Sequence, residues 1–135
     1  MDTTMSIEKL EAYRGLTSEM KALSQQITSL YDTYRSPQFM SDGGHSMIAS
    51  NPTESAVEKI LNLKELYSKK YEEALDLLAE VESWLSTVDD VEIRSICRHH
   101  YILNKSWQQT STIVYGYQSY YNARKRVMRY FGREK

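Results

Sequence analysis

The chain has little of the chemistry that stabilises small secreted proteins or shapes β-turns. It contains one cysteine, Cys97, which cannot form an internal disulfide, so a reducing cytoplasm is the expected location. Only five glycines and two prolines occur among 135 residues, which leaves few turn formers for a β-rich fold. The sequence therefore favours an all-α fold.

Long hydrophobic runs are also lacking. No apolar segment reaches the roughly 18 residues that a membrane-spanning helix needs, so no membrane partner is expected. The first five residues, MDTTM, have neither the basic flank nor the apolar core of a secretory signal. With 26% charged and 11% aromatic residues, the composition is typical of a soluble globular protein.

The charges are distributed unevenly along the chain. Residues 1–90 hold eight Lys/Arg and sixteen Asp/Glu, whereas residues 91–135 hold nine Lys/Arg and two Asp/Glu. The net charges of the two parts are therefore −8 and +7. Such an asymmetry indicates either that the C-terminal part binds a polyanion or that the two parts attract each other.

Two long amphipathic helices are predicted in the N-terminal part. Apolar residues recur at alternating intervals of three and four over residues 6–35, and a second, longer seam covers residues 52–87. Asn51 and Pro52 suit the start of the second helix, and a mobile connector is expected over residues 35–51. Residues 1–88 are thus predicted to form a long antiparallel, coiled-coil-like hairpin. Its remaining apolar stripe would serve a homodimer or another partner.

Residues 89–135 are predicted to form a unit of three helices. Asp89 is the expected N-cap of the first, and Asn104 the residue that ends it. Ser106 and Gln109 have the spacing of a capping box, and Gly116 ends the short helix that follows. Ser119 is the expected N-cap of the last helix.

Two short helices joined by a turn that contains glycine, the second of them basic, are typical of a helix-turn-helix. The recognition helix would span residues 119–131 and lie in the major groove of double-stranded DNA. Amides near its start suit adenine, a lysine suits guanine, and arginines further along suit phosphates. The predicted DNA-binding residues are Gln118, Ser119, Tyr121, Asn122, Arg124, Lys125, Arg126, Arg129 and Arg133.

The segment VDDVEIRSICRHHYILNKSWQQTSTIVYGYQSYYNARKRVMRYF resembles a known family. It is similar to small regulators of phages and prophages of Gram-positive bacteria, whose C-terminal domain is like region 4 of sigma-70 factors. ArpU-like late regulators are related in type. The resemblance implies binding of promoter-like DNA in the host cytoplasm, with host RNA polymerase as a further partner. Where these regulators carry Ile-Ala in the first helix of the motif, this chain has Thr110-Ser111.

Other site chemistries have weaker support in the sequence. Cys97, His99 and His100 lie close together, but a structural zinc site needs four ligands, and the remaining histidine, His45, lies in the connector. No orienting residue or oxyanion arrangement accompanies the Cys97–His100 pair. We therefore expect no metal, no cofactor and no enzymatic activity.

Three functions are consistent with these patterns. The first is transcriptional regulation by sequence-specific DNA binding, in a homodimer formed through the long helices. The second is a protein-interaction module whose basic helix docks on a partner or on acidic residues of the same chain, a group that includes Glu72, Glu73, Asp76, Glu80 and Glu82. The third is a DNA-packaging subunit similar to a small terminase.

Overall fold

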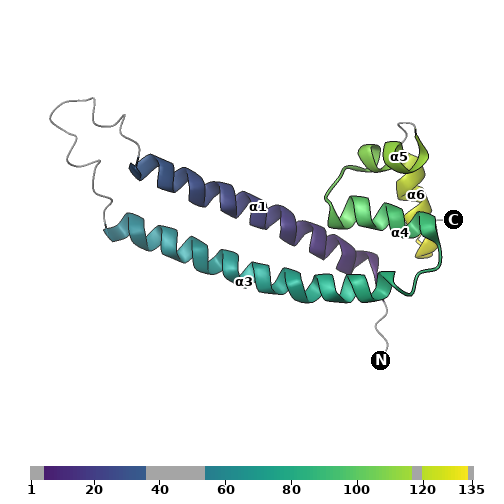
Figure 1. Cartoon of the computed structure of the whole chain (residues 1–135), viewed down its shortest axis with the longest axis horizontal. Coiled ribbons are helices and arrows are strands. Elements are labelled where there is room, and N and C mark those ends of the chain that lie inside the picture. The colour runs from purple at the N-terminus through teal and green to yellow at the C-terminus, as the bar shows by residue number, and fades with distance from the viewer. Residues whose placement is uncertain (1–4, 36–53, 117–119, 134–135) are drawn as a thin grey trace. The chain divides into compact units, whose positions relative to one another are not determined.

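A computed structural model describes residues 5–35, 54–116 and 120–133 (Figure 1). Within these ranges the chain forms five α-helices and one π-helical segment and has no β-strand, so the predicted all-α class is confirmed. The elements are α1 (Ile7–Arg35), α3 (Glu54–Leu85), α4 (Val91–Cys97), the π-helix η2 (Arg98–Ile102), α5 (Trp107–Tyr115) and α6 (Tyr120–Tyr130). None of these helices is both long enough and apolar enough to cross a membrane.

The chain divides into two compact units. The first comprises residues 1–18 together with residues 73–135, and the second comprises residues 19–72. Helices α1 and α3 each contribute to both units. The boundary expected between residues 88 and 89 lies inside the first unit, because the first turns of α1 and the end of α3 belong to the same unit as the C-terminal helices.

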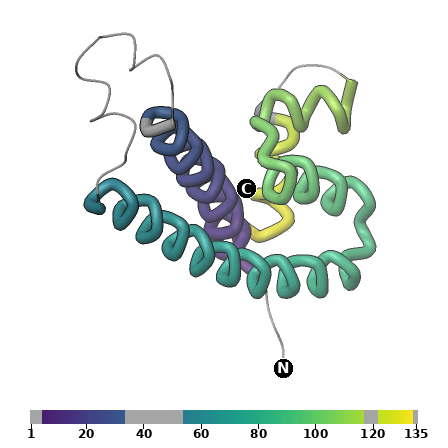
Figure 2. Tube along the Cα trace, turned by 60° about the vertical axis from the view of Figure 1, so that its left-hand side comes forward, coloured from purple at the N-terminus to yellow at the C-terminus, as the bar shows by residue number. Residues whose placement is uncertain are grey.

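The first unit is built around a continuous apolar core. The buried side chains come from both ends of the sequence, which explains why the beginning of α1 belongs to this unit. Helix α6 packs on both α4 and α5 (Figure 2). The core residues are Met5, Ile7, Leu10, Val81, Leu85, Val88, Ile93, Ile96, Cys97, Tyr101, Ala123 and Val127.

Helix α4 begins one residue later than predicted. Its N-cap is Asp90, whose Oδ1 accepts hydrogen bonds from the backbone N–H groups of Glu92 (3.0 Å) and Ile93 (3.3 Å). The prediction of Asp89 as the cap is wrong, and Asp89 is exposed. Either aspartate has the right chemistry for an N-cap. Asp90 is the one whose second carboxylate oxygen also meets a cation, Arg126.

The end of this helix departs from regular α-helical geometry. After Cys97 the chain continues as the π-helix η2, in which the backbone N–H of Leu103 donates to the carbonyl of Arg98 (2.9 Å). His100 and Tyr101, adjacent in sequence, are both buried. Asn104 then adopts a left-handed φ of 64°, which asparagine tolerates better than most residues, and the helix ends where predicted.

Helix α5 has the ends that the sequence predicts. Ser106 Oγ accepts a hydrogen bond from the backbone N–H of Gln109 (3.0 Å), and the Gln109 side chain accepts one from the Ser106 N–H (2.9 Å). This reciprocal pair is the predicted capping box. Gly116 ends the helix with a φ of 84°, a left-handed conformation that glycine adopts without a Cβ clash.

In the second unit, α1 and α3 run antiparallel. Glu19 and Lys70 form an ion pair (3.4 Å), and the Lys64 ammonium lies over the ring of Tyr31, 5.0 Å from its centroid. Among the described residues of this unit, three apolar side chains are buried: Leu23, Ala56 and Ile60. The predicted connector and the Asn51–Pro52 helix start lie outside the described residues.

Candidate nucleic-acid interface

Helix α6 is fixed to the first unit through one face. Ala123 and Val127 are fully buried on this face. The Oγ of Ser111 in α5 accepts a hydrogen bond from the backbone N–H of Ala123 (3.2 Å). Ser111 thus supplies a buried side-chain acceptor for an N–H in the first turn of α6. Helix α5 thus helps to hold the first turn of α6 against the core.

The opposite face of α6 carries exposed cations. Lys125 and Arg129 are exposed, and neither makes a hydrogen bond or an ion pair with any residue that the structure describes. Asn122 is half-buried and precedes them by three and seven residues. At 3.6 residues per turn, these three side chains start within about 60° of one another around the helix axis. An amide and two cations therefore share one face of α6.

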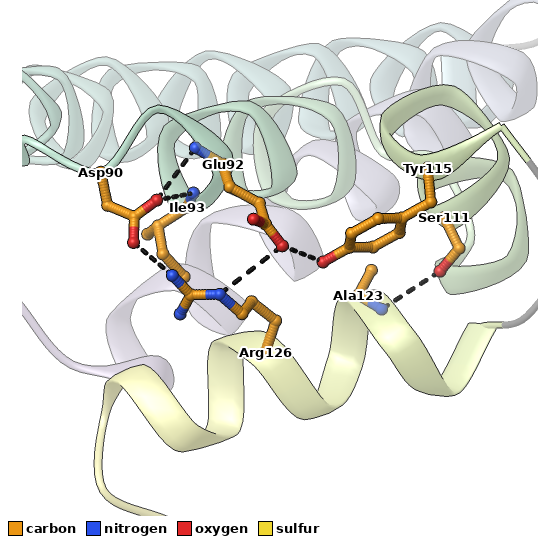
Figure 3. Close-up of polar contacts among 7 residues, drawn as sticks. All are labelled: Asp90, Glu92, Ile93, Ser111, Tyr115, Ala123 and Arg126. Carbon is orange, nitrogen blue, oxygen red and sulfur yellow. Dashed lines mark hydrogen bonds and ion pairs between the residues drawn. The ribbon is translucent and has the colours of Figure 1, made fainter.

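Arg126, which was predicted to contact DNA, lies instead among acidic side chains (Figure 3). Its Nη2 donates to Oδ2 of Asp90, and its Nε lies 3.5 Å from Oε2 of Glu92. The hydroxyl of Tyr115 donates to the same oxygen of Glu92. This group, the Arg126 network, connects α6 with the start of α4 and the end of α5.

The Arg126 network has a clear electrostatic effect on Asp90. Burial acts to raise the pKa of this carboxyl. The amide of Ile93, the Arg126 guanidinium and the amide of Glu92 outweigh burial and hold the pKa below its usual value. Asp90 is therefore a charged cap at neutral pH, and it pairs with the Arg126 side chain of α6.

Two other arginines that were predicted to bind DNA also interact with residues of the same chain. Arg133 donates to the carboxylate of Glu8, and this contact holds the pKa of Glu8 below its ordinary value. Arg124 is half-buried, and its charge acts on the buried Tyr101 hydroxyl. These carboxylate partners are not the acidic residues of α3 named above as an alternative. Of those, Glu80 pairs with Lys9 and Glu82 pairs with Arg98.

The remaining predicted DNA-binding residues fall where the structure gives no side-chain description. Gln118 and Ser119 lie outside the described residues, as does the Tyr121 side chain, although Tyr121 belongs to α6. The structure thus brings Asn122, Lys125 and Arg129 together on one face. It directs Arg126 and Arg133 toward carboxylates.

Sequence reasoning did not predict the hydrogen bond between Ser111 and Ala123 or that between Tyr115 and Glu92; it placed Glu92 only at the third position of the helix that Asp89 was expected to cap. Ser111 had a usable signal, since it occupies the position where the resembled regulators carry a small residue in the first helix of the motif. The contact of Tyr115 with Glu92 joins residues 23 apart in sequence, and no local pattern indicates it.

The Cys97–His100 region has the features of a packed core. His100 stacks on Trp107 (3.5 Å between ring centroids), and its Nδ1 lies 2.7 Å from the Lys105 carbonyl. Burial lowers the pKa of His100 to about 4 and raises that of Cys97 to about 12. No group of three or more His, Cys, Asp or Glu is gathered for metal binding in the part of the chain that the structure describes.

Arg14 joins the start of α1 to this region. Its Nε donates to the carbonyl of His100 (2.9 Å), and its Nη2 donates to that of Lys105 (3.2 Å). A pocket of 540 Å³ lies beside these contacts. Its lining residues are Glu11, Arg14, Gly15, Ser18, His100, Ser106 and Trp107.

Comparison with models of protein families, with curated proteins and with solved structures finds no match to this chain.

Proposed function

We propose that this protein is a DNA-binding regulator of phage or prophage transcription, with α6 as the helix that enters the major groove. Asn122 would read a base edge, and Lys125 would contact guanine. Arg129 would neutralise a phosphate. Gln118, Ser119, Tyr121 and Arg124 complete the proposed contact set. Arg126 and Arg133 reach phosphates only where DNA competes with their carboxylate partners.

The observation that carries this proposal is the unpaired cationic face of α6. Lys125 and Arg129 are exposed without a carboxylate partner among the described residues, although the chain has acidic side chains within reach of Arg126 and Arg133. The buried face of the same helix is held by Ala123 and Val127. A helix fixed on one side and cationic on the other is what recognition of a duplex requires.

We further propose that the protein acts as a homodimer through its long helices, with host RNA polymerase as an additional partner. Two recognition helices on one dimer engage two half-sites, and the second contact becomes effectively intramolecular. This raises affinity without further contacts to each half-site. The cytoplasm of the host cell is the corresponding location.

The test is the salt dependence of binding to a labelled duplex of random sequence. The logarithm of the association constant should fall linearly with the logarithm of salt concentration. Arg129→Ala should reduce the magnitude of the slope by about 1, since it removes one phosphate contact.

Two control variants distinguish a specific effect of Arg129 from a general effect of net charge. Lys59→Ala makes the same change in net charge at an exposed position of α3. Because α3 is not proposed to contact DNA, this variant should leave the slope unchanged. Arg126→Ala removes a cation that is already paired, so its effect on the slope should be smaller than that of Arg129→Ala. If duplex DNA does not bind at low salt, or if Arg129→Ala and Lys59→Ala behave alike, the DNA-binding proposal is wrong.

A protein-interaction module is the second candidate. The observation that favours it is that Arg126 and Arg133, two cations of the basic C-terminal segment, are bound to carboxylates of the same chain. For such a module, DNA binding would be weak and equally insensitive to Arg129→Ala and Arg126→Ala.

A further inference from the structure

The part of α3 in the second unit has apolar side chains that face solvent. Val57, Leu61 and Tyr71 are 44%, 58% and 49% exposed. At 100° per residue they start within about 80° of one another around the helix. The same unit has only three buried apolar side chains among its described residues. Two helices with so small a core leave apolar side chains of α3 exposed to water, and burial of this face against another protein surface would be favourable.

These exposed residues belong to a regular coiled-coil seam. Positions 57, 61, 64, 68 and 71 follow one another at alternating steps of four and three, with Lys64 and Ser68 in the middle. We call these five positions the α3 seam. Lys64 and Ser68 also line a groove of 390 Å³ between α3 and α1. The other lining residues are Ser24, Ile27, Thr28 and Tyr67.

We propose that the α3 seam binds the α3 seam of a second copy of this chain, antiparallel, with the two-fold axis at residue 66. This inference rests on the proposed function and deepens it by assigning the dimer surface. In this register Leu61 lies opposite Tyr71 of the second copy, and Lys64 lies opposite Ser68 of the second copy. Val57 lies opposite Leu75 of the second copy, which is 47% exposed and follows Tyr71 at the next step of four, so each apolar layer is apolar on both sides.

The charges on α3 distinguish the two possible directions of pairing. In a parallel pair, Lys64 would share a core layer with Lys64 of the second copy, and like charges there are unfavourable. In the antiparallel pair, Lys64 meets a hydroxyl instead. Its stem can pack in the seam while the ammonium stays at the edge, as it does over Tyr31.

Glu65 supplies a second electrostatic argument. It is exposed and has no ion pair among the described residues. At a rise of 1.5 Å per residue, the antiparallel register places it about 3 to 5 Å along the axis from Lys64 and Lys69 of the second copy. The two copies of Glu65 approach each other near the two-fold axis, and the two copies of Lys64, whose ammonium groups stay at the edge of the seam, offset their repulsion.

Cysteine cross-linking tests the register directly in the full-length protein. Leu61→Cys and Tyr71→Cys are made separately and oxidised without DNA, either alone or mixed. The mixture should give a covalent dimer that contains one copy of each variant, and each variant alone should give little. Cys97 is fully buried and does not interfere. Self-linking of Leu61→Cys as strong as in the mixture would show a parallel or unspecific contact and overturn the proposal.

Light scattering of two serine variants provides the matched control. Leu61→Ser should raise the dimer dissociation constant about tenfold to a hundredfold, since the change occurs twice in each dimer. Leu66→Ser alters another exposed leucine, on a different flank of α3, and should leave the constant unchanged. Equal effects of the two variants, or a monomeric wild-type protein, would refute the α3 seam as the dimer surface.

The two proposals fail separately. If the dimer is absent but Arg129→Ala still changes the salt slope, DNA binding remains and the dimer surface is wrong. If cross-linking succeeds but no duplex binds, the dimer surface is correct and the DNA-binding proposal is wrong.

Discussion

Thr110 offers a sharp test of the packing between α5 and the rest of the first unit. Its side chain is fully buried, and its Oγ1 has no hydrogen-bond partner among the described residues. A buried hydroxyl without a partner costs about 1–3 kcal/mol. Valine has nearly the same shape and helix propensity as threonine but no hydroxyl. Thr110→Val should therefore raise the free energy of unfolding by about 1–2 kcal/mol and the midpoint of thermal unfolding by roughly 3–8 °C.

Tryptophan fluorescence during urea unfolding measures this change in the relevant unit, because both tryptophans, Trp84 and Trp107, lie in it. Thr112→Val is the matched control on the same helix. Thr112 is exposed and its hydroxyl donates to the Gln108 carbonyl (3.0 Å), so its replacement should change stability by less than about 0.5 kcal/mol. A Thr110→Val protein that is no more stable than wild type would show that the hydroxyl is paired and refute the reasoning.

Two further outcomes are expected. Ser111→Ala removes the hydrogen bond that Ser111 accepts from the Ala123 N–H and should lower the free energy of unfolding by about 0.5–1.5 kcal/mol in the same fluorescence assay, whereas no measurable loss would show that this bond does not stabilise the packing of α6 on α5. The pKa of His100 is lowered by burial from 6.5 to about 4, so the unfolded chain binds a proton in this range that the folded chain does not. Stability should therefore decrease as the pH falls from about 6.5 to about 4, and His100→Phe should weaken this dependence; parallel pH profiles for the two proteins would contradict the assignment.

The fold class and several helix ends could be predicted because they depend on local chemistry. Scarce glycine and proline, together with a 3.6-residue period, indicate helices. The capping box at Ser106 and the left-handed ends at Asn104 and Gly116 follow from single residues. The choice between Asp89 and Asp90 as N-cap did not, since both have the same side chain. Asp90 differs through its contact with Arg126, 36 residues away.

The sequence was sufficient to predict which residues of α6 face away from the core, but not which of its arginines are paired with carboxylates. Periodicity places Asn122, Lys125 and Arg129 on one face and Ala123 and Val127 on the other, and the structure has them so. Arg126 starts only about 60° from Arg129 around the helix, and no local rule separates a paired arginine from an exposed one. That distinction required the positions of Asp90 and Glu92, which packing between helices determines.

The contribution of α1 to the first unit has a consequence for how this protein is made and dissected. Leu10 is fully buried in the same core as Val127, and Arg14 caps carbonyls near residue 100. During synthesis, Leu10 leaves the ribosome well before Val127, so this core closes only after both have been made. Helix α6 is therefore not separable from α1: a fragment that lacks Leu10 leaves its place in the core empty, and truncated or fused proteins should keep both helices.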